Sequence, residues 1–297
     1  MITKTSIPIW PKNVSLGKQH INDLDLKINY PINTTSYVLL NEVNGRRTIQ
    51  EISNTVSKKY NWDAEMVEID FCILTTELNK QYLMNVKYKN PLKNNIINMI
   101  IFILLMTKTI NPNTWGVSKR FHINRKGSKV FFQITRIIVL SYFWIIFYLT
   151  LLLSFIMLYI NSFEWLTLFI IVASIIFGMV VHEFAHYIVF IYFDRGKHNT
   201  FFVNKMGQTK FIRPPMNYKE DILITIAGPM LPFLLSIICL PIIGILEWIE
   251  INVAITWWGA VLCLCMHIMF LFPPFQDGRR IVSLLFSHKR GQKNEKG

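Results

Sequence analysis

The chain has 297 residues, 52% of them hydrophobic and 14% aromatic, with a mean hydropathy of +0.34. Such a composition is too apolar for an ordinary soluble domain, but it leaves room for a soluble module beside a membrane part. The net charge is +13, yet the basic residues lie next to apolar stretches rather than in one patch, which favours orientation in a membrane over binding to nucleic acid. The four cysteines have the spacing of neither a disulfide framework nor a zinc knuckle.

Residues 1–88 are predicted to form a small α+β domain. Two short strand-like runs bounded by Pro and Asn, Ile7–Trp10 and Leu26–Tyr30, precede three helical patterns. The second helix should begin after Thr48, because Glu51 follows three residues later, at the spacing of a capping box. Apolar side chains recur at helical spacing in these segments, so we expect them to pack as the core of this domain.

The order of these elements resembles a known family. The run Tyr37–Gly45, YVLLNEVNG, continues through RRTIQEI and is followed by a long helix over Val67–Leu83. This pattern, over about residues 20–88, is similar to the PqqD-like peptide-recognition domain of peptide natural-product pathways. The resemblance implies a winged-helix-like cytoplasmic domain whose strand edge and adjacent helix capture an extended leader peptide. A DNA-binding winged helix is the competing interpretation, but the third helix carries acidic residues that would repel phosphate, namely Glu65, Glu68, Asp70 and Glu77.

Residues 89–136 are expected to be a basic connector, and residues 137–290 an all-α membrane domain, followed by a basic tail at 291–297. The connector holds one apolar run, Ile96–Met106, which is too short to span a bilayer comfortably and is interpreted as interfacial or packed. A mixed loop is expected at Phe201–Lys219. Four runs of the membrane domain are long enough to cross a bilayer, at about residues 137–160, 165–193, 221–246 and 251–272.

Charge asymmetry predicts the orientation of these four spans. The loops Asn161–Glu164 and Glu247–Glu250 contain no Lys or Arg, whereas the other connections and both termini are rich in them. The positive-inside rule therefore predicts an integral, multi-pass protein of the bacterial cell membrane with its N- and C-termini in the cytoplasm.

The second span contains the sequence VHEFAHY, within an apolar run from Trp165 to Phe193. On a helix, His182 and His186 lie one turn apart on one face and can ligate the same metal. Glu183 lies about 100° round the helix, where it can act as a base on a metal-bound water. In a soluble helix this pattern is often a solvated face, but ionisable groups at membrane depth cost roughly 3 kcal/mol each and require a partner. The pattern therefore predicts a zinc hydrolase site.

A catalytic zinc needs a third protein ligand, and Asp277 in LFPPFQDG is the best candidate. Pro273 and Pro274 should break the fourth span near its cytoplasmic end, and Gly278 permits a tight backbone that turns Asp277 inward. His267 is the rival ligand. On a straight helix it would lie roughly 15 Å deeper than Asp277, so it is interpreted as a packed or hydrogen-bonded histidine.

These residues carry a second resemblance, over about residues 137–290. The segments HEFAH, Ala227-Gly-Pro and PFQDG are similar to the site-2 protease family of intramembrane zinc peptidases. Met269 stands where that family usually has an Asn associated with holding the substrate backbone or the site geometry. The resemblance implies Glu183 as the catalytic base and zinc on His182, His186 and Asp277. It also implies four structural residues near the site, namely Gly228, Pro229, Pro274 and Gly278.

The predicted reaction is zinc-assisted peptide hydrolysis, in which Glu183 takes a proton from water and delivers it to the leaving amine. Together the two halves resemble membrane peptidases found beside ribosomally made, modified peptides of the epipeptide type. The expected substrate is such a precursor, captured by the N-terminal domain, with a peptide-modifying enzyme and an exporter as further partners and no nucleic acid. Two alternatives stay open: a regulatory site-2-type protease that cuts a single-span signalling protein, and a non-enzymatic membrane protein for peptide immunity or export.

Overall fold

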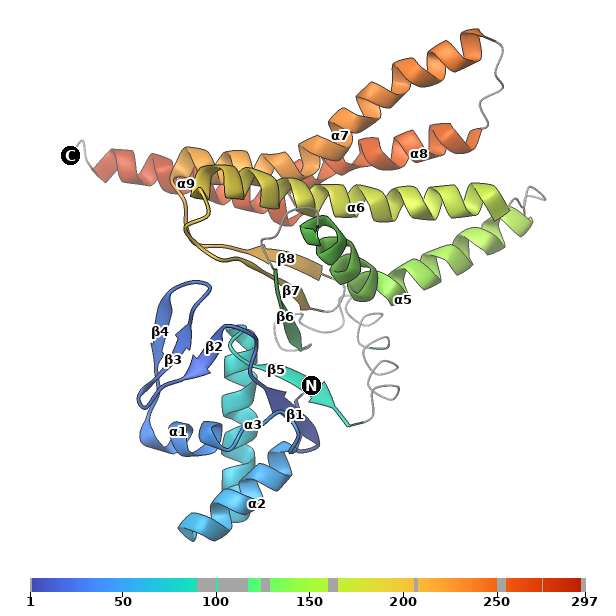
Figure 1. Cartoon of the computed structure of the whole chain (residues 1–297). Coiled ribbons are helices and arrows are strands. Elements are labelled where there is room, and N and C mark those ends of the chain that lie inside the picture. The colour runs from blue at the N-terminus through green and yellow to red at the C-terminus, as the bar shows by residue number, and fades with distance from the viewer. Residues whose placement is uncertain are drawn as a thin grey trace. The chain divides into compact units, whose positions relative to one another are not determined.

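The computed structural model describes residues 2–89, 100, 117–123, 129–159, 165–205, 208–249, 255–273 and 275–294. The chain divides into two compact units, each described below by itself (Figure 1). We call residues 1–124 with 198–214 the N-terminal unit, and residues 125–197 with 215–297 the helical unit. The apolar run Ile96–Met106 lies, apart from Ile100, outside the described residues.

The N-terminal unit is built around three helices and two small sheets that form its first part. Strand β1 pairs antiparallel with β5, and β2, β3 and β4 form an antiparallel sheet in that order. The core between these elements is apolar and includes Phe71 and Ile52, which are fully buried. The bounds are β1 Ser6–Ile9, β2 Val14–Leu16, β3 His20–Asp23, β4 Ile28–Pro31, α1 Thr34–Asn41, α2 Ile49–Tyr60, α3 Ala64–Lys80 and β5 Asn85–Tyr88.

Helix α2 begins as predicted. The Glu51 backbone N–H donates to Thr48 Oγ1 at 3.2 Å, and the Thr48 backbone N–H donates to Glu51 Oε2 at 2.8 Å, so the capping box is confirmed. The predicted strands correspond to β1 and β4, but β2 and β3 were not predicted. Strand β2 alternates over only three residues, VSL, and β3 reads HIND, so neither shows the longer apolar alternation that identifies a strand in a sequence.

A third sheet comes from segments that were predicted as connector and loop. Strand β6 (Ser118–His122) pairs antiparallel with β7 (Phe201–Lys205), which pairs antiparallel with β8 (Gln208–Ile212). The prediction of a mixed loop at Phe201–Lys219 was therefore wrong for its first part, which is a β-hairpin. The pairing of β6 with β7 joins residues about 80 positions apart in the chain. The periodicity of apolar residues within one segment cannot predict a pairing with such a distant strand.

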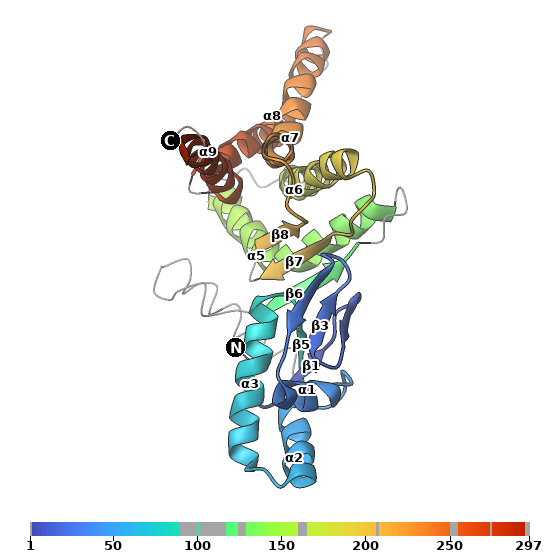
Figure 2. The same ribbon diagram turned by 90° about the vertical axis from the view of Figure 1, so that its left-hand side faces the viewer.

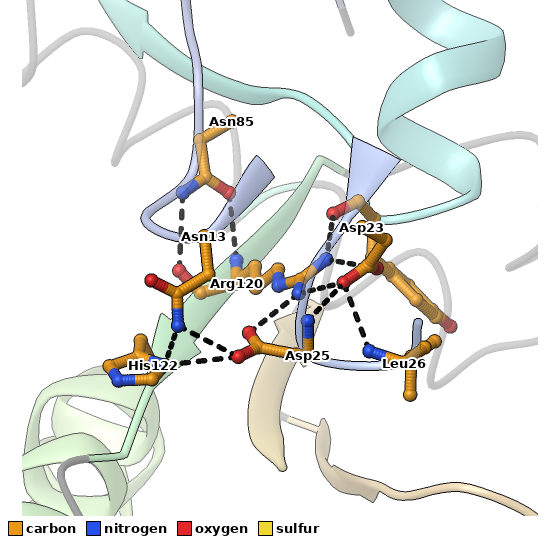
Figure 3. Close-up of polar contacts among 8 residues, drawn as sticks. Asn13, Asp23, Asp25, Leu26, Asn85, Arg120 and His122 are labelled. Atoms are coloured by element: carbon orange, nitrogen blue, oxygen red, sulfur yellow. Dashed lines mark hydrogen bonds and ion pairs between the residues drawn. The ribbon is translucent and has the colours of Figure 1, made fainter. Parts of the chain in front are cut away.

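A buried ion cluster attaches β6 to the rest of the N-terminal unit (Figure 3). Arg120 donates from Nη1 to Asp23 Oδ2 and from Nη2 to Asp25 Oδ2, both at 2.7 Å, and these three side chains are at most 1% exposed. Burial opposes the charge of Arg120, but the hydrogen bonds to Asp23 and Asp25 and the negative charges of these two carboxylates together outweigh burial and raise the pKa of Arg120. The Arg120 backbone also exchanges two hydrogen bonds with the side-chain amide of Asn85. The strand is thus held by polar contacts that span the sequence.

The helical unit consists of helices (Figures 1 and 2), of which α5, α6 and α7 are the long apolar ones, with 31, 30 and 31 residues. Helix α6 packs against α5, α7 and α8. Among the described residues, three helical stretches are long and apolar enough to cross a membrane, or four if α5, bent by 64° between Phe143 and Ile146, counts as one span. The bounds are α5 Lys129–Tyr159, α6 Trp165–Asp194, α7 Tyr218–Trp248, α8 Ile255–Cys265, the 3-10 helix η1 Met266–Leu271 and α9 Gln276–Asn294.

Two predicted spans have different bounds in the structure. The first was expected to begin at Ile137, but α5 begins at Lys129, inside the predicted basic connector. The fourth was expected to end near residue 272, but α8 ends at Cys265, and the apolar stretch Trp257–Phe286 includes η1 and part of α9. Arg136 shortened the first prediction, because a hydropathy argument stops at a charge although a helix does not. The fourth was shortened because Pro273 and Pro274 were expected to break the helix.

Candidate metal centre

The structure brings together the three side chains that the sequence analysis named as metal ligands. His182 Nε2 lies 3.0 Å from Asp277 Oδ2 and 3.2 Å from His186 Nε2, and His186 Nε2 lies 3.6 Å from the same carboxylate oxygen. Their ligand atoms all lie within 4.8 Å of one another. The two histidines are one turn apart on α6, and Asp277 is in the first turn of α9. Three possible metal-ligand atoms, from two helices, therefore face one point.

The His186 ring is oriented by α7. Its Nδ1 lies 2.6 Å from the backbone carbonyl oxygen of Ile224, so Nδ1 carries the proton and donates it to this carbonyl. The lone pair of Nε2 then faces His182 and Asp277. This arrangement, in which the outer nitrogen donates to a carbonyl, is common for metal-binding histidines because it selects the tautomer and fixes the ring.

Gly228 makes room for that ring. A Cβ atom at this position would come within 3.0 Å of three atoms of the His186 ring, so no other residue fits without displacing the histidine. Pro229 follows inside α7, where its missing N–H removes one helical hydrogen bond. The Ala-Gly-Pro segment thus lies against the centre through the glycine.

A compact turn between η1 and α9 positions Asp277. The Phe275 backbone N–H donates to the Phe272 carbonyl at 3.1 Å, and Gly278 packs directly on the preceding backbone. A Cβ atom on Gly278 would come within 2.7 Å of backbone atoms of Leu271 and Phe272. The glycine is therefore required by close packing of the backbone. Pro274, predicted to contribute to this turn, lies outside the described residues.

His267 lies closer to the centre than predicted. Its ring centroid is 5.9 Å from that of His182, so the expectation that it lies roughly 15 Å away along a straight helix was wrong. The chain leaves the α-helical path at Cys265, continues as the 3-10 helix η1 and is extended at Phe272 before Asp277, so the rise of a straight α-helix does not apply between these two residues. Its Nδ1 lies 3.1 Å from the Cys263 carbonyl oxygen, which fits a hydrogen-bonded histidine.

Gly178 was missed by the sequence analysis. A Cβ atom there would come within 3.2 Å of three atoms of the His267 ring, so this glycine provides the space in which that ring lies. It is one helical turn before His182 on α6. In the sequence, the only indication of this role was a glycine one helical turn before His182. The packing of the helices is needed to show that the His267 ring occupies the space beside it.

The donor set fits a zinc ion. Bonds of about 2.0–2.1 Å in a tetrahedral arrangement separate two ligand atoms by roughly 3.3 Å, close to the three distances measured here. Two neighbouring polar atoms, His182 Nδ1 and Glu183 Oε2, are buried and have no hydrogen-bond partner within the described parts of the chain. Unpaired buried polar atoms are costly in a folded protein and are frequent at functional sites. Glu183 is thus free to bind a water or substrate proton.

No family model, curated protein or solved structure matches this chain. The resemblances to the PqqD-like domain and to the site-2 protease family therefore depend on the residues and motifs quoted above. Met269, at the position of the family's usual Asn, lies on η1 with 44% of its surface exposed.

Proposed function

We propose that this chain is an integral membrane zinc metallopeptidase. The observation that carries the proposal is the convergence of His182, His186 and Asp277 on helices long and apolar enough to cross a membrane, beside Glu183, whose buried Oε2 has no hydrogen-bond partner among the described residues. Large apolar side chains on these helices are exposed, which is favourable in lipid and unfavourable in water. Examples are Tyr159, Trp165, Leu166, Phe169, Trp248 and Leu262.

Each residue of the centre has a separate task in this proposal. The Ile224 carbonyl keeps the lone pair of His186 Nε2 directed toward His182 and Asp277, and the Asp277 carboxylate would offset part of the charge of an ion held there. Glu183 accepts a proton from water and then delivers it to the leaving amine. A zinc ion held there would supply Lewis acidity, which polarises the scissile carbonyl and acidifies water.

The N-terminal unit supports a peptide as substrate. Strand β4 is at the edge of the sheet β2–β3–β4, and Ile28 on this strand is 44% exposed. An exposed edge offers unpaired backbone groups to which an extended peptide can add as a further strand. We propose that a ribosomally made, modified precursor binds there, and that both termini are cytoplasmic, so that recognition and cleavage occur on one side of the membrane.

The proposal is tested by co-expressing the chain with the short open reading frames adjacent to its gene and with any peptide-modifying enzyme encoded there. Peptide masses are compared between the wild type and Glu183→Gln, with bound zinc measured in both purified proteins. A truncated peptide that requires Glu183, together with zinc retained in the variant, is the expected result. Glu247→Gln is the matched control, because Glu247 accepts a hydrogen bond from Trp258 Nε1 and lies on α7 away from the centre.

Two outcomes would contradict the proposal. Identical peptide masses with Glu183 and with Gln at this position would exclude cleavage of these precursors, and a single-span signalling protein would become the substrate to test. Absence of zinc from the wild-type protein would exclude the metallopeptidase as a class.

A further inference from the structure

An ion pair outside the centre joins the two helices that complete it. Arg280 Nη2 lies 2.9 Å from Asp221 Oδ1 and 3.3 Å from Asp221 Oδ2. Asp221 is in the first turn of α7 and its side chain is 10% exposed, while that of Arg280, on α9, is 41% exposed. Helices α7 and α9 pack against each other. The pair therefore lies at the contact between these two helices.

The ion pair is one turn away from the centre on both helices. Asp221 precedes Ile224 by three residues on α7, and Arg280 follows Asp277 by three residues on α9. Residues at this spacing share a helix face. The turn of α7 that orients His186 through a carbonyl is thus linked to the turn of α9 that supplies the carboxylate.

These two turns hold His186 from opposite sides of its ring. The Ile224 carbonyl lies at Nδ1, and Asp277 Oδ2 lies 3.6 Å from Nε2. The distance between α7 and the start of α9 consequently sets how closely Asp277 approaches the point that His182 and His186 face. Gly278 cannot supply this link, because its close contacts are to Leu271 and Phe272 in the adjoining turn.

We propose that the Asp221–Arg280 ion pair is a positioning device that places Asp277 for metal binding, and so sets the affinity of the centre. This inference rests on the proposed metal site and assigns these two residues no contact with substrate. Outer partners that orient metal ligands typically change metal affinity by roughly 10- to 100-fold when they are removed. An ion pair that only joins α7 to α9 would change the stability of the unit and leave the affinity of the folded protein unaltered.

The test is the affinity of the full-length protein, purified in detergent, for Co²⁺, measured by titration against a chelator and by the visible spectrum of the bound ion. We expect Asp221→Asn and Arg280→Gln each to weaken Co²⁺ binding roughly 10- to 100-fold, and Asp221→Arg combined with Arg280→Asp to restore most of the loss. Arg279→Gln is the matched control, because Arg279 is the exposed neighbour of Arg280 on α9. It should leave the affinity unchanged.

Whether Arg280→Gln weakens or strengthens Co²⁺ binding distinguishes a positioning role of Arg280 from an effect of its charge alone. Removing a positive charge near a cation site strengthens cation binding by Coulomb's law, whereas loss of positioning weakens it. Unchanged or tighter Co²⁺ binding by Arg280→Gln would therefore overturn the inference. Arg280→Lys keeps the charge and loses the planar donor group, so it provides a second variant if Arg280→Gln fails to fold. A wild-type protein that binds no Co²⁺ would instead overturn the proposed metal site, and this inference with it.

Discussion

Replacing Arg120 by Met is predicted to destabilise the N-terminal unit strongly. The guanidinium donates to Asp23 Oδ2 and Oδ1 at 2.7 and 2.8 Å and to Asp25 Oδ2 at 2.7 Å. Its carbon atom lies 3.6 Å from the centre of the Phe201 ring. Met fills part of this space but leaves two buried carboxylates without their cation. Breaking a buried pair in this way costs about 3–5 kcal/mol, a large fraction of the 5–15 kcal/mol typical of a domain.

Hydrogen exchange read by mass spectrometry on the full-length protein measures this loss as the free energy of opening of the amides in β3 and β6. Arg47→Met is the matched control. Arg47 Nη2 lies 2.8 Å from Glu42 Oε2, but these side chains are 33% and 23% exposed, so the loss of this pair should cost about 0–1 kcal/mol. If Arg120→Met costs no more than Arg47→Met, the reasoning about the buried cluster is refuted.

A compensating variant separates the unpaired charges from the lost packing. Adding Asp23→Asn and Asp25→Asn to Arg120→Met removes the buried charges altogether. Because replacement of a whole buried ion cluster by neutral groups is often close to neutral in free energy, the triple variant should recover most of the loss. A triple variant as unstable as Arg120→Met would mean that the packing of Arg120 against Phe201, rather than charge, holds β6 in place.

Three further predictions use single side chains. Gly228→Ala should abolish zinc retention because its Cβ overlaps the His186 ring, whereas Gly244→Ala on the same helix, with nothing within 4 Å of its Cβ, should retain zinc as measured by mass spectrometry of the metal. Burial raises the pKa of Tyr88 from 10.0 to about 12. The folded chain keeps this proton to higher pH than the unfolded chain, so the free energy of unfolding should fall between pH 10 and 12 by up to about 3 kcal/mol. Hydrogen exchange should show that Tyr88→Phe removes this part of the fall. Thr48→Ala should destabilise α2 by about 1 kcal/mol, through loss of the capping box, in the same measurement.

The sequence by itself determined the features that depend on neighbouring residues. The capping box of Thr48 and Glu51 needs residues three positions apart, and the shared face of His182 and His186 needs only one helical turn. The length of the apolar runs likewise predicted helices long enough to cross a membrane. These signals are local, because each follows from the period of one helix.

Only the tertiary structure decided the features that depend on distant residues. Strand β6 is held by Asp23 and Asp25, almost 100 positions earlier in the chain, and the sheet β6–β7–β8 was not predicted. His267 was placed far from His182 because a straight helix was assumed, whereas a turn after η1 changes the path of the chain. The pattern of residues within one segment indicates the period of that segment. It does not indicate which distant segment packs against it, or the direction that the chain takes after a turn, because both are decided by tertiary packing.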